Sequence, residues 1–183
     1  MNCAFGVLWG AWVLFWLAFA RGNKRTATPV GLRWRFTALA AILVVLLGSR
    51  QFPEYFRHPL RSPRAAWAYI GLTLTAGGLW FAMWPRRVLG TNWSALPGLK
   101  KDHELIERGP YRLVSHPIYT GLLLAIFGTF LAGGRVWDLS IVAMAALLLI
   151  VKLKAEEALL TRQFPDAYPQ YQRRVKAIIP FLY

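Results

Sequence analysis

The chain has 183 residues, of which 56% are hydrophobic and only 16% are charged, and its mean hydropathy is +0.38. This composition excludes an ordinary soluble domain, because a water-exposed fold of this size cannot bury so much apolar surface. The net charge of +14 does not indicate a nucleic-acid partner, since the basic residues fall in loops between apolar runs. We therefore expect one polytopic membrane domain surrounded by the lipid bilayer.

Five apolar runs predict an all-α fold with about five transmembrane helices. The runs extend over Cys3–Ala20, Leu32–Gly48, Ala65–Trp84, Ile118–Ala132 and Leu139–Leu153. A membrane-spanning helix needs roughly 17 to 25 residues, so the last two runs are short. The sequence Gly133-Gly134-Arg135 between them predicts a tight turn, and these two helices are therefore expected to form a hairpin.

The distribution of basic residues predicts the orientation of the helices. With the N-terminus outside, the outer segments contain only five of the 22 Lys and Arg residues, namely Arg50, Arg57, Arg61, Arg64 and Arg135. The positive-inside rule favours this arrangement, which places the C-terminus on the cytoplasmic side. The single cysteine and the three widely separated histidines form no metal-binding pattern, so no metal site is predicted.

Two segments contain more charged, aromatic and proline residues than membrane anchoring requires. The first, Leu89–Gly121, ends in G-P-Y-R-L-V-S-H-P-I-Y-T-G from Gly109 to Gly121. The second begins at Lys152 and includes Glu156 and Glu157. Charges so close to an apolar run are costly unless they are solvated, paired or used in function. Since the predicted topology puts both segments on the cytoplasmic side, we expect them to lie side by side.

The two segments together resemble the isoprenylcysteine carboxyl methyltransferase family and its phospholipid methyltransferase relatives. The resemblance covers Leu89–Phe181 and rests on L-G-T-N-W-S from Leu89, H-E-L-I-E-R-G-P-Y-R from His103, H-P-I-Y-T-G from His116, the glutamate pair, and the tail F-P-D-A-Y-P-Q-Y-Q-R-R-V with its late Pro180. It implies a membrane enzyme that uses S-adenosylmethionine and releases S-adenosylhomocysteine. It also implies a domain in which residues 1–85 supply N-terminal spans and residues 86–183 form the catalytic core.

The same resemblance implies a cytoplasmic cofactor pocket, formed by the loop before the fourth helix and a helical C-terminal tail. Residues expected to shape this pocket are Tyr111, His116, Pro117, Tyr119 and Gly121. Glu156 would face the cofactor or the reacting centre, with Glu157 beside it. Where such sequences commonly read Arg-His-Pro, this chain has Ser115, so any role of that positive charge is either absent here or supplied by Arg112.

The acceptor is expected to be lipophilic and to enter from the membrane, and its chemistry stays open. A prenylcysteine carboxylate is already ionised and needs a positive guide, for which Arg174, Arg173 and Lys154 are candidates. We assign this orienting role to Arg174. A phospholipid amine must first lose a proton, and Glu156 or Glu157 would then be the natural base.

Two further functions remain as alternatives. A reductase of the sterol-reductase type would bind NADPH in the corresponding pocket, which is an inference from fold alone. A non-enzymatic scaffold or transporter would need only the membrane helices, and the glutamates would then be a solvated helix end paired with Lys152, Lys154 or Arg162. The expected function is nevertheless methyl transfer, because several ordered motifs agree with the predicted topology.

Overall fold

The structure is a computed structural model that describes residues 2–20, 26–29, 33–60, 62, 64–90, 98–100 and 105–180. Its elements, in chain order, are α1 (Asn2–Ala20), β1 (Thr26–Pro29), α2 (Arg33–Gln51), α3 (Pro53–Arg57), α4 (Ala65–Leu89), β2 (Gly98–Lys100), the 3-10 helix η2 (Gly109–Arg112), α5 (Pro117–Gly133), α6 (Val136–Gln163) and α7 (Ala167–Arg174). Each of the five predicted apolar runs is a helix. Two of them extend beyond the prediction, α4 to Leu89 and α6 to Gln163.

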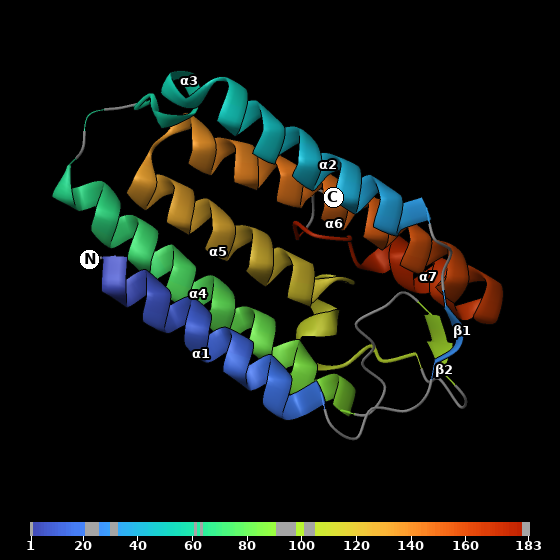
Figure 1. The fold of residues 1–183 in the computed structure, drawn as a ribbon. Coiled ribbons are helices and arrows are strands. Elements are labelled where there is room, and N and C mark those ends of the chain that lie inside the picture. The colour runs from blue at the N-terminus through green and yellow to red at the C-terminus, as the bar shows by residue number, and fades with distance from the viewer. Residues whose placement is uncertain are drawn as a thin grey trace.

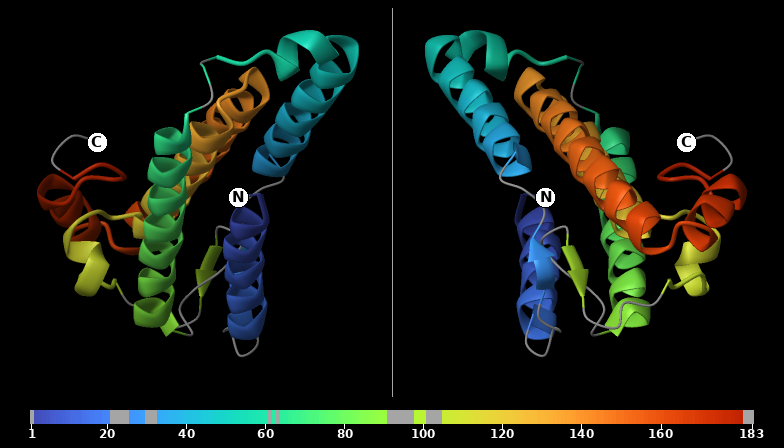
Figure 2. Two further views of the ribbon diagram at one scale, coloured as in Figure 1. Left: turned by 90° about the vertical axis from the view of Figure 1, so that its left-hand side faces the viewer. Right: turned by 90° about the vertical axis from the view of Figure 1, so that its right-hand side faces the viewer.

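The five long helices lie side by side in the order α1, α4, α5, α6 and α2 (Figure 1). Figure 2 shows that this row is curved, so that α1 and α2 at its two ends lie on the same side of the molecule. Because α4 packs on α5, the contact joins the predicted N-terminal spans to the predicted catalytic core. The loops after α1 and α4 also meet, and β1 pairs there with β2 in an antiparallel ladder. The sequence did not predict this pair, since runs of four and three residues are too short for an alternating pattern.

Small residues form the interface between α4 and α5. On α4 they are Gly71, Thr75, Gly78 and Ala82, and they face Gly121, Ala125, Gly128 and Ala132 on α5. Both sets follow steps of four, three and four residues, which keeps them on one face of each helix. A Cβ atom on Gly78 would lie 2.6 Å from the backbone nitrogen of Ala125 and from the carbonyl oxygen of Gly121. The two backbones therefore touch, as small residues permit in membrane helix pairs.

The predicted turn between the last two long helices is confirmed. Gly134 has a left-handed backbone with φ of 68°, and its N–H donates to the carbonyl oxygen of Phe130 at 2.7 Å. This conformation favours glycine and ends the helix. The next helix starts at Val136, where Asp138 accepts a 3.0 Å hydrogen bond from the backbone N–H of Arg135. The short loop therefore forces α5 and α6 to run antiparallel.

A buried arginine attaches α1 to the end of α4. Arg86 is only 2% exposed, and its guanidinium donates to the carbonyl oxygens of Phe19 and Gly90. The same group lies 5.9 Å from the ring centroid of Trp16 and 5.6 Å from that of Phe19. Carbonyl oxygens and aromatic faces together compensate a buried cation, because both present negative potential. Arg86 thus fixes the C-terminal end of α1 against α4.

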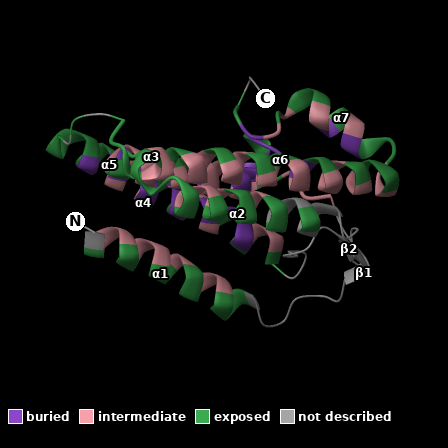
Figure 3. Ribbon diagram, turned by 45° about the horizontal axis from the view of Figure 1, so that its top comes forward, coloured by how far each residue is buried: buried purple, intermediate pink, exposed green. Residues whose placement is uncertain are grey.

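The outer helices expose apolar surface that suits lipid. Figure 3 shows that burial concentrates on α4, α5 and the C-terminal region, while the described side chains of α1 and α2 are exposed or intermediate. Large exposed apolar residues on these two helices include Val7, Leu14, Val44 and Leu47. By length and composition α4 and α6 are able to cross a membrane, and α1, α2 and α5 contain shorter apolar stretches. The helical framework is confirmed, whereas five complete spans and their orientation stay predictions.

Candidate active site

The C-terminal tail lies along the loop that leads into α5. The backbone N–H of Ser115 donates to the carbonyl oxygen of Lys176 at 2.8 Å, and that of His116 donates to Ala177 at 2.9 Å. One turn later, the hydroxyl of Thr120 donates to the carbonyl oxygen of Ile178 at 2.7 Å. The two segments that the sequence singled out are therefore in direct contact, as predicted.

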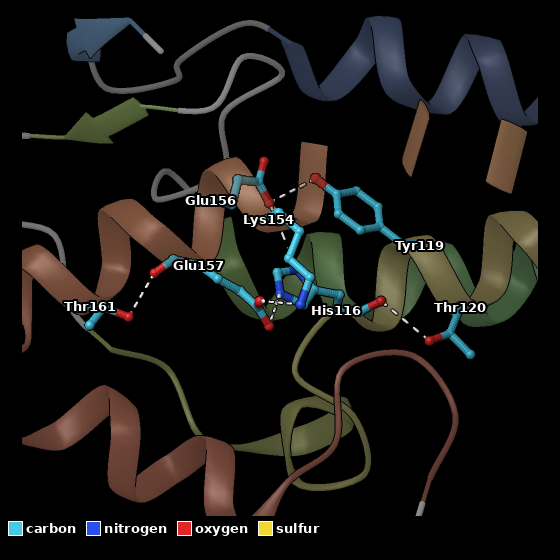
Figure 4. Close-up of polar contacts among 7 residues, drawn as sticks. All are labelled: His116, Tyr119, Thr120, Lys154, Glu156, Glu157 and Thr161. Atoms are coloured by element: carbon cyan, nitrogen blue, oxygen red, sulfur yellow. Dashed lines mark hydrogen bonds and ion pairs between the residues drawn. The ribbon is translucent and has the colours of Figure 1, made fainter. Parts of the chain in front are cut away.

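The sequence His116-Pro117 starts α5 and sets the direction of the histidine. Pro117 occupies the first helical position and is buried, where its missing N–H costs nothing. A residue before proline avoids the helical conformation, so His116 stays outside the helix with φ of −124° and ψ of 61°. Its carbonyl oxygen still accepts from the backbone N–H groups of Tyr119 and Thr120 at 3.0 and 3.1 Å. This arrangement directs the buried imidazole toward α6, as Figure 4 shows.

A tyrosine connects α5 to the glutamate pair on α6. The hydroxyl of Tyr119 donates a 2.7 Å hydrogen bond to Oε2 of Glu156 (Figure 4). The ring of Tyr119 lies parallel to that of His116, with 5.3 Å between the ring centroids and 6° between the planes. Tyr119 also packs with Leu153 and Ile178 in the apolar cluster under the site. Packing and a hydrogen bond thus hold the phenol in one position against Glu156.

His116 lies between the two glutamates. Its Nδ1 is 3.8 Å from Oε2 of Glu156, and its Nε2 is 3.8 Å from Oε1 of Glu157. Both distances exceed hydrogen-bond length, so neither carboxylate accepts a hydrogen bond from the imidazole. Burial, together with the ammonium groups of Lys152 and Lys154, lowers the pKa of His116 to about 3. The imidazole is therefore neutral at pH 7, and within the described residues its buried Nε2 has no hydrogen-bond partner.

The structure distinguishes Lys152 from Lys154, both of which the sequence offered as partners of the glutamate pair. Lys152 is 19% exposed, its Nζ lies 3.9 Å from Oε1 of Glu156, and it sits 5.3 Å from the ring centroid of Tyr119. Lys154 is 62% exposed and lies 3.6 Å from Oε2 of Glu157. Both lysines face a glutamate on the helical period, at spacings of four and three residues, so the difference comes from the packing of Lys152 against Tyr119 of α5. Lys152 is thus the basic residue at the centre of the cluster, which the sequence analysis did not include among its site residues.

The aromatic residues of η2 and α7 close one side of this region. Tyr111 and Tyr171 are buried, and the hydroxyl of Tyr171 donates to the carbonyl oxygen of Tyr111 at 2.6 Å. Burial raises the pKa of Tyr111 well above its ordinary value, so its phenol stays protonated. Because this hydrogen bond joins residues 60 positions apart, it attaches α7 to η2.

Three predicted site residues have other surroundings. Arg174 is 66% exposed, and its Nη2 lies 2.9 Å from Oε2 of Glu107. Arg112 is exposed at the end of η2. Gly121 packs against Gly78 and Ala82 of α4, where a Cβ atom would lie 2.5 Å from the carbonyl oxygen of Gly78. The roles assigned to these residues in acceptor or cofactor binding stay predictions.

Part of the motif region lies outside the described residues. This applies to Asn92, Trp93 and Ser94 of the L-G-T-N-W-S motif and to His103. In the part of the chain that is described, no group of three or more His, Cys, Asp and Glu side chains is placed to hold a metal ion. The groups available to a ligand are therefore carboxylates, a neutral imidazole, phenols and an ammonium.

The sequence is similar to a protein family model and to several known proteins. The family model described as phospholipid methyltransferase matches residues 67–167, which includes α5 and the glutamate pair. A similar protein is the nickel-cobalt-cadmium resistance protein NccN of Alcaligenes xylosoxydans xylosoxydans, 26% identical over 151 residues, with 81% of this chain and 63% of NccN covered. Another is the cobalt-zinc-cadmium resistance protein CzcN of Cupriavidus metallidurans, 28% identical over 171 residues, with 91% and 70% covered.

A third relative is named as an enzyme. The chain is 35% identical over 83 residues to the protein-S-isoprenylcysteine O-methyltransferase of Schizosaccharomyces pombe, which covers 45% of this chain and 35% of that protein. The chain thus spans less than two thirds of the length of two of these relatives. The family model matches more than half of the chain and confirms the resemblance found in the motifs. The protein therefore belongs to the phospholipid methyltransferase family of membrane proteins.

Proposed function

We propose that this protein transfers a methyl group from S-adenosylmethionine to a lipophilic acceptor that enters from the membrane. The observation that carries the proposal is the partly buried cluster of His116, Tyr119, Glu156 and Glu157, formed by the two motif segments of a methyltransferase-family chain. The positive-inside distribution of Lys and Arg supports a cytoplasmic position for this cluster, with the N-terminus outside.

The side chains of the cluster fit the chemical groups of the cofactor. S-adenosylmethionine carries an ammonium group and ribose hydroxyls, both of which donate hydrogen bonds to carboxylates such as Glu156 and Glu157. The unpartnered Nε2 of His116 lies next to Glu157 and supplies a further polar atom for a ligand. A buried polar atom normally has a partner in the functional state. Tyr111 and Tyr119 would add aromatic surface, which attracts a sulfonium.

The protein's contribution to the reaction would be orientation. When bound, the cofactor supplies an already activated methyl group, whose bond to sulfur breaks as the bond to the acceptor forms. Tyr119 and Lys152 hold Glu156 from two sides, at 2.7 Å and 3.9 Å. The backbone of residues 176–178 accepts hydrogen bonds from Ser115, His116 and Thr120, and we expect this segment to limit the access of water from the side of the tail. Correct orientation of two reactants is able to supply roughly 7 to 11 kcal/mol of the barrier.

The acceptor we favour is the carboxylate of a prenylcysteine or of a similar lipophilic molecule. The position of Lys152 supports this choice, because a mostly buried ammonium beside Glu156 is able to guide an anionic acceptor. The charges of carboxylate and sulfonium also cancel in the transition state, which a water-poor site favours. In this proposal Arg174 orients the acceptor nearer the surface.

A phospholipid amine is the second candidate acceptor, and one observation favours it. The hydrogen bond from Tyr119 fixes Glu156, the only member of the pair that contacts both a tyrosine and a lysine among the described residues. A fixed carboxylate is suited to accept the proton that an amine must lose before it attacks. The pH dependence of turnover distinguishes the candidates, since only the amine reaction requires an unprotonated acceptor nitrogen.

The test is calorimetric binding to the detergent-purified protein. S-adenosylmethionine and S-adenosylhomocysteine are expected to bind with micromolar Kd, and Glu156→Gln is expected to weaken both. Glu54→Gln, which changes a carboxylate on the short helix α3, is the matched control. NADPH and cobalt chloride are measured alongside, the latter because two relatives are named metal resistance proteins. Binding of NADPH or cobalt without binding of the sulfur cofactors would overturn the proposal.

A further inference from the structure

A cavity lies at the end of the molecule away from the candidate active site. Its volume is about 290 Å³, and it is lined by Ser49, Pro53, Phe56, Arg57, Arg135 and Trp137. These residues come from the end of α2, from α3 and from the start of α6. Figure 1 shows α3 and the turn between α5 and α6 at one end of the helix row, with α7 at the other end.

Backbone contacts bring the two arginines of this cavity together. The N–H of Leu60 donates to the carbonyl oxygen of Gly134 at 2.8 Å, and the N–H of Val136 donates to that of His58 at 3.2 Å. The ring of Phe56 meets that of Trp137 edge to face, with 6.0 Å between centroids. The segment after α3 is thereby fixed to the start of α6, so Arg57 and Arg135 line one space although they are far apart in sequence.

The charge of this cavity favours an anion. Two guanidinium groups line it, and the described residues of its lining include no carboxylate. Among the described residues neither Arg57 nor Arg135 forms an ion pair within 4 Å. The nearby carboxylate of Asp138 accepts the backbone N–H of Arg135 and serves as the cap of α6. A guanidinium without a carboxylate partner is a ready site for a phosphate oxygen.

The position of the cavity points to lipid as the source of the anion. Trp137 precedes Glu156 by 19 residues on one helix, which corresponds to about 28 Å along α6. The hydrocarbon core of a bilayer is about 30 Å thick, so the cavity lies at the membrane boundary opposite the cluster around Glu156. Exposed apolar residues of α2, such as Val44 and Leu47, continue from this end and offer a surface for acyl chains. Trp137 in the lining suits this boundary as well.

We propose that the cavity formed by α2, α3 and the start of α6 binds the phosphate group of an anionic membrane lipid. Arg57 and Arg135 contact the phosphate oxygens, while Phe56 and Trp137 contact the glycerol backbone. This site is independent of the methyl transfer proposed above, and its test does not require enzymatic activity.

The experiment measures lipid binding by native mass spectrometry of the full chain in detergent. Phosphatidylglycerol and phosphatidylcholine with identical acyl chains are added separately, and inorganic phosphate is added as a competitor. The test variant is Arg57→Gln/Arg135→Gln. The matched control is Arg50→Gln/Arg64→Gln, which removes two exposed arginines of the same end that do not line the cavity. Thermal unfolding of each variant in detergent establishes that it is folded.

The expected result is preferential retention of phosphatidylglycerol, lost in the test variant and kept in the control. A basic residue near an anionic lipid contributes about fivefold in affinity, so the two together predict a loss of about 30-fold. Equal losses in both variants would overturn the site in favour of general surface attraction. Competition by millimolar inorganic phosphate, without preference between the two lipids, would overturn the assignment to lipid.

Discussion

The hydroxyl of Tyr119 donates a 2.7 Å hydrogen bond to Oε2 of Glu156, and this contact joins the first turn of α5 to the C-terminal half of α6. It connects the two sequence segments that carry the family motifs.

Replacing Tyr119 with phenylalanine removes the hydrogen bond and keeps the ring. A hydrogen bond to a charged group contributes about 1.5 to 3 kcal/mol, so turnover is expected to fall by about 10- to 100-fold. The measurement is transfer of a labelled methyl group to a prenylcysteine acceptor. Tyr69→Phe, on an exposed tyrosine of α4, is expected to leave turnover unchanged. Wild-type turnover in Tyr119→Phe would show that the contact has no part in the reaction.

The two lysines of α6 are expected to differ in their effect on activity. Lys152→Gln removes an ammonium that is 19% exposed and lies against Glu156 and Tyr119, and we expect at least about a tenfold loss of kcat/KM. Lys154→Gln removes one that is 62% exposed, where an ion pair is worth about 0 to 1 kcal/mol, so the loss stays below about fivefold. Steady-state kinetics of both variants side by side provide the measurement. Equal losses would contradict the placement of Lys152 at the centre of the cluster.

Because His116 is buried in its neutral form, the folded protein is expected to lose stability in acid. Its pKa is about 3 in the folded protein and about 6.5 when unfolded, so the unfolded chain takes up the proton first as the pH falls. The contribution of the neutral His116 to stability is therefore fully present above pH 6.5. As the pH falls from 8 to 5, protonation of this residue in the unfolded chain alone lowers the free energy of unfolding by about 2 kcal/mol.

The measurement for His116 is the thermal midpoint in detergent across this pH range. His116→Gln is expected to have a flatter profile than the wild type, whatever its absolute stability. His58→Gln, which changes an exposed histidine, should keep the wild-type slope. An unchanged slope in His116→Gln would mean that the imidazole is not buried in its neutral form.

Adjacent glycines of α4 provide a test of the helix packing. Gly78→Ala puts a methyl group 2.6 Å from backbone atoms of α5, and overpacking of this kind costs about 1 to 3 kcal/mol. Gly77→Ala meets nothing within 4 Å and is expected to stabilise the helix by about 0.5 to 1 kcal/mol. Thermal unfolding of the two variants should therefore shift in opposite directions. A shift in the same direction for both would contradict the close approach of α4 and α5.

Variants of Arg174 and Glu107 distinguish two roles of Arg174, the binding of an acceptor and a surface ion pair. If Arg174 orients the acceptor, Arg174→Gln raises KM by about tenfold, while Glu107→Gln, which breaks the same 2.9 Å pair, leaves KM unchanged or lowers it. If the pair only attaches α7 to the preceding loop, both variants change KM and stability alike. Kinetics with a prenylcysteine acceptor, together with thermal unfolding, distinguish the two results.

Much of the framework follows from local sequence. Runs of apolar residues predicted each of the five long helices, and the glycine pair before Arg135 predicted the turn that joins the last two. The family resemblance assigned the motif residues His116, Tyr119, Glu156 and Glu157 to one site, and in the structure these four side chains lie together. Their binding and catalytic roles stay predictions.

Other features of the fold could not be predicted from local sequence patterns. The β1–β2 pair joins runs too short for a periodic signal, and the contact of Arg86 with the end of α1 joins residues 67 positions apart. Spacing alone also did not predict that Gly121 packs against α4. Each of these depends on how two distant helices or loops are aligned, which no pattern within one segment encodes.

The sequence by itself determined that this is a helical membrane protein and which two segments carry its family motifs, because the length of an apolar run and the residues of a motif are both properties of a local stretch of sequence. Only the tertiary structure decided that Lys152 rather than Lys154 lies against Glu156 and Tyr119, that Arg174 pairs with Glu107, and that Arg57 and Arg135 share a cavity. These outcomes depend on the rotation and register of packed helices. Contacts across the whole molecule set that register.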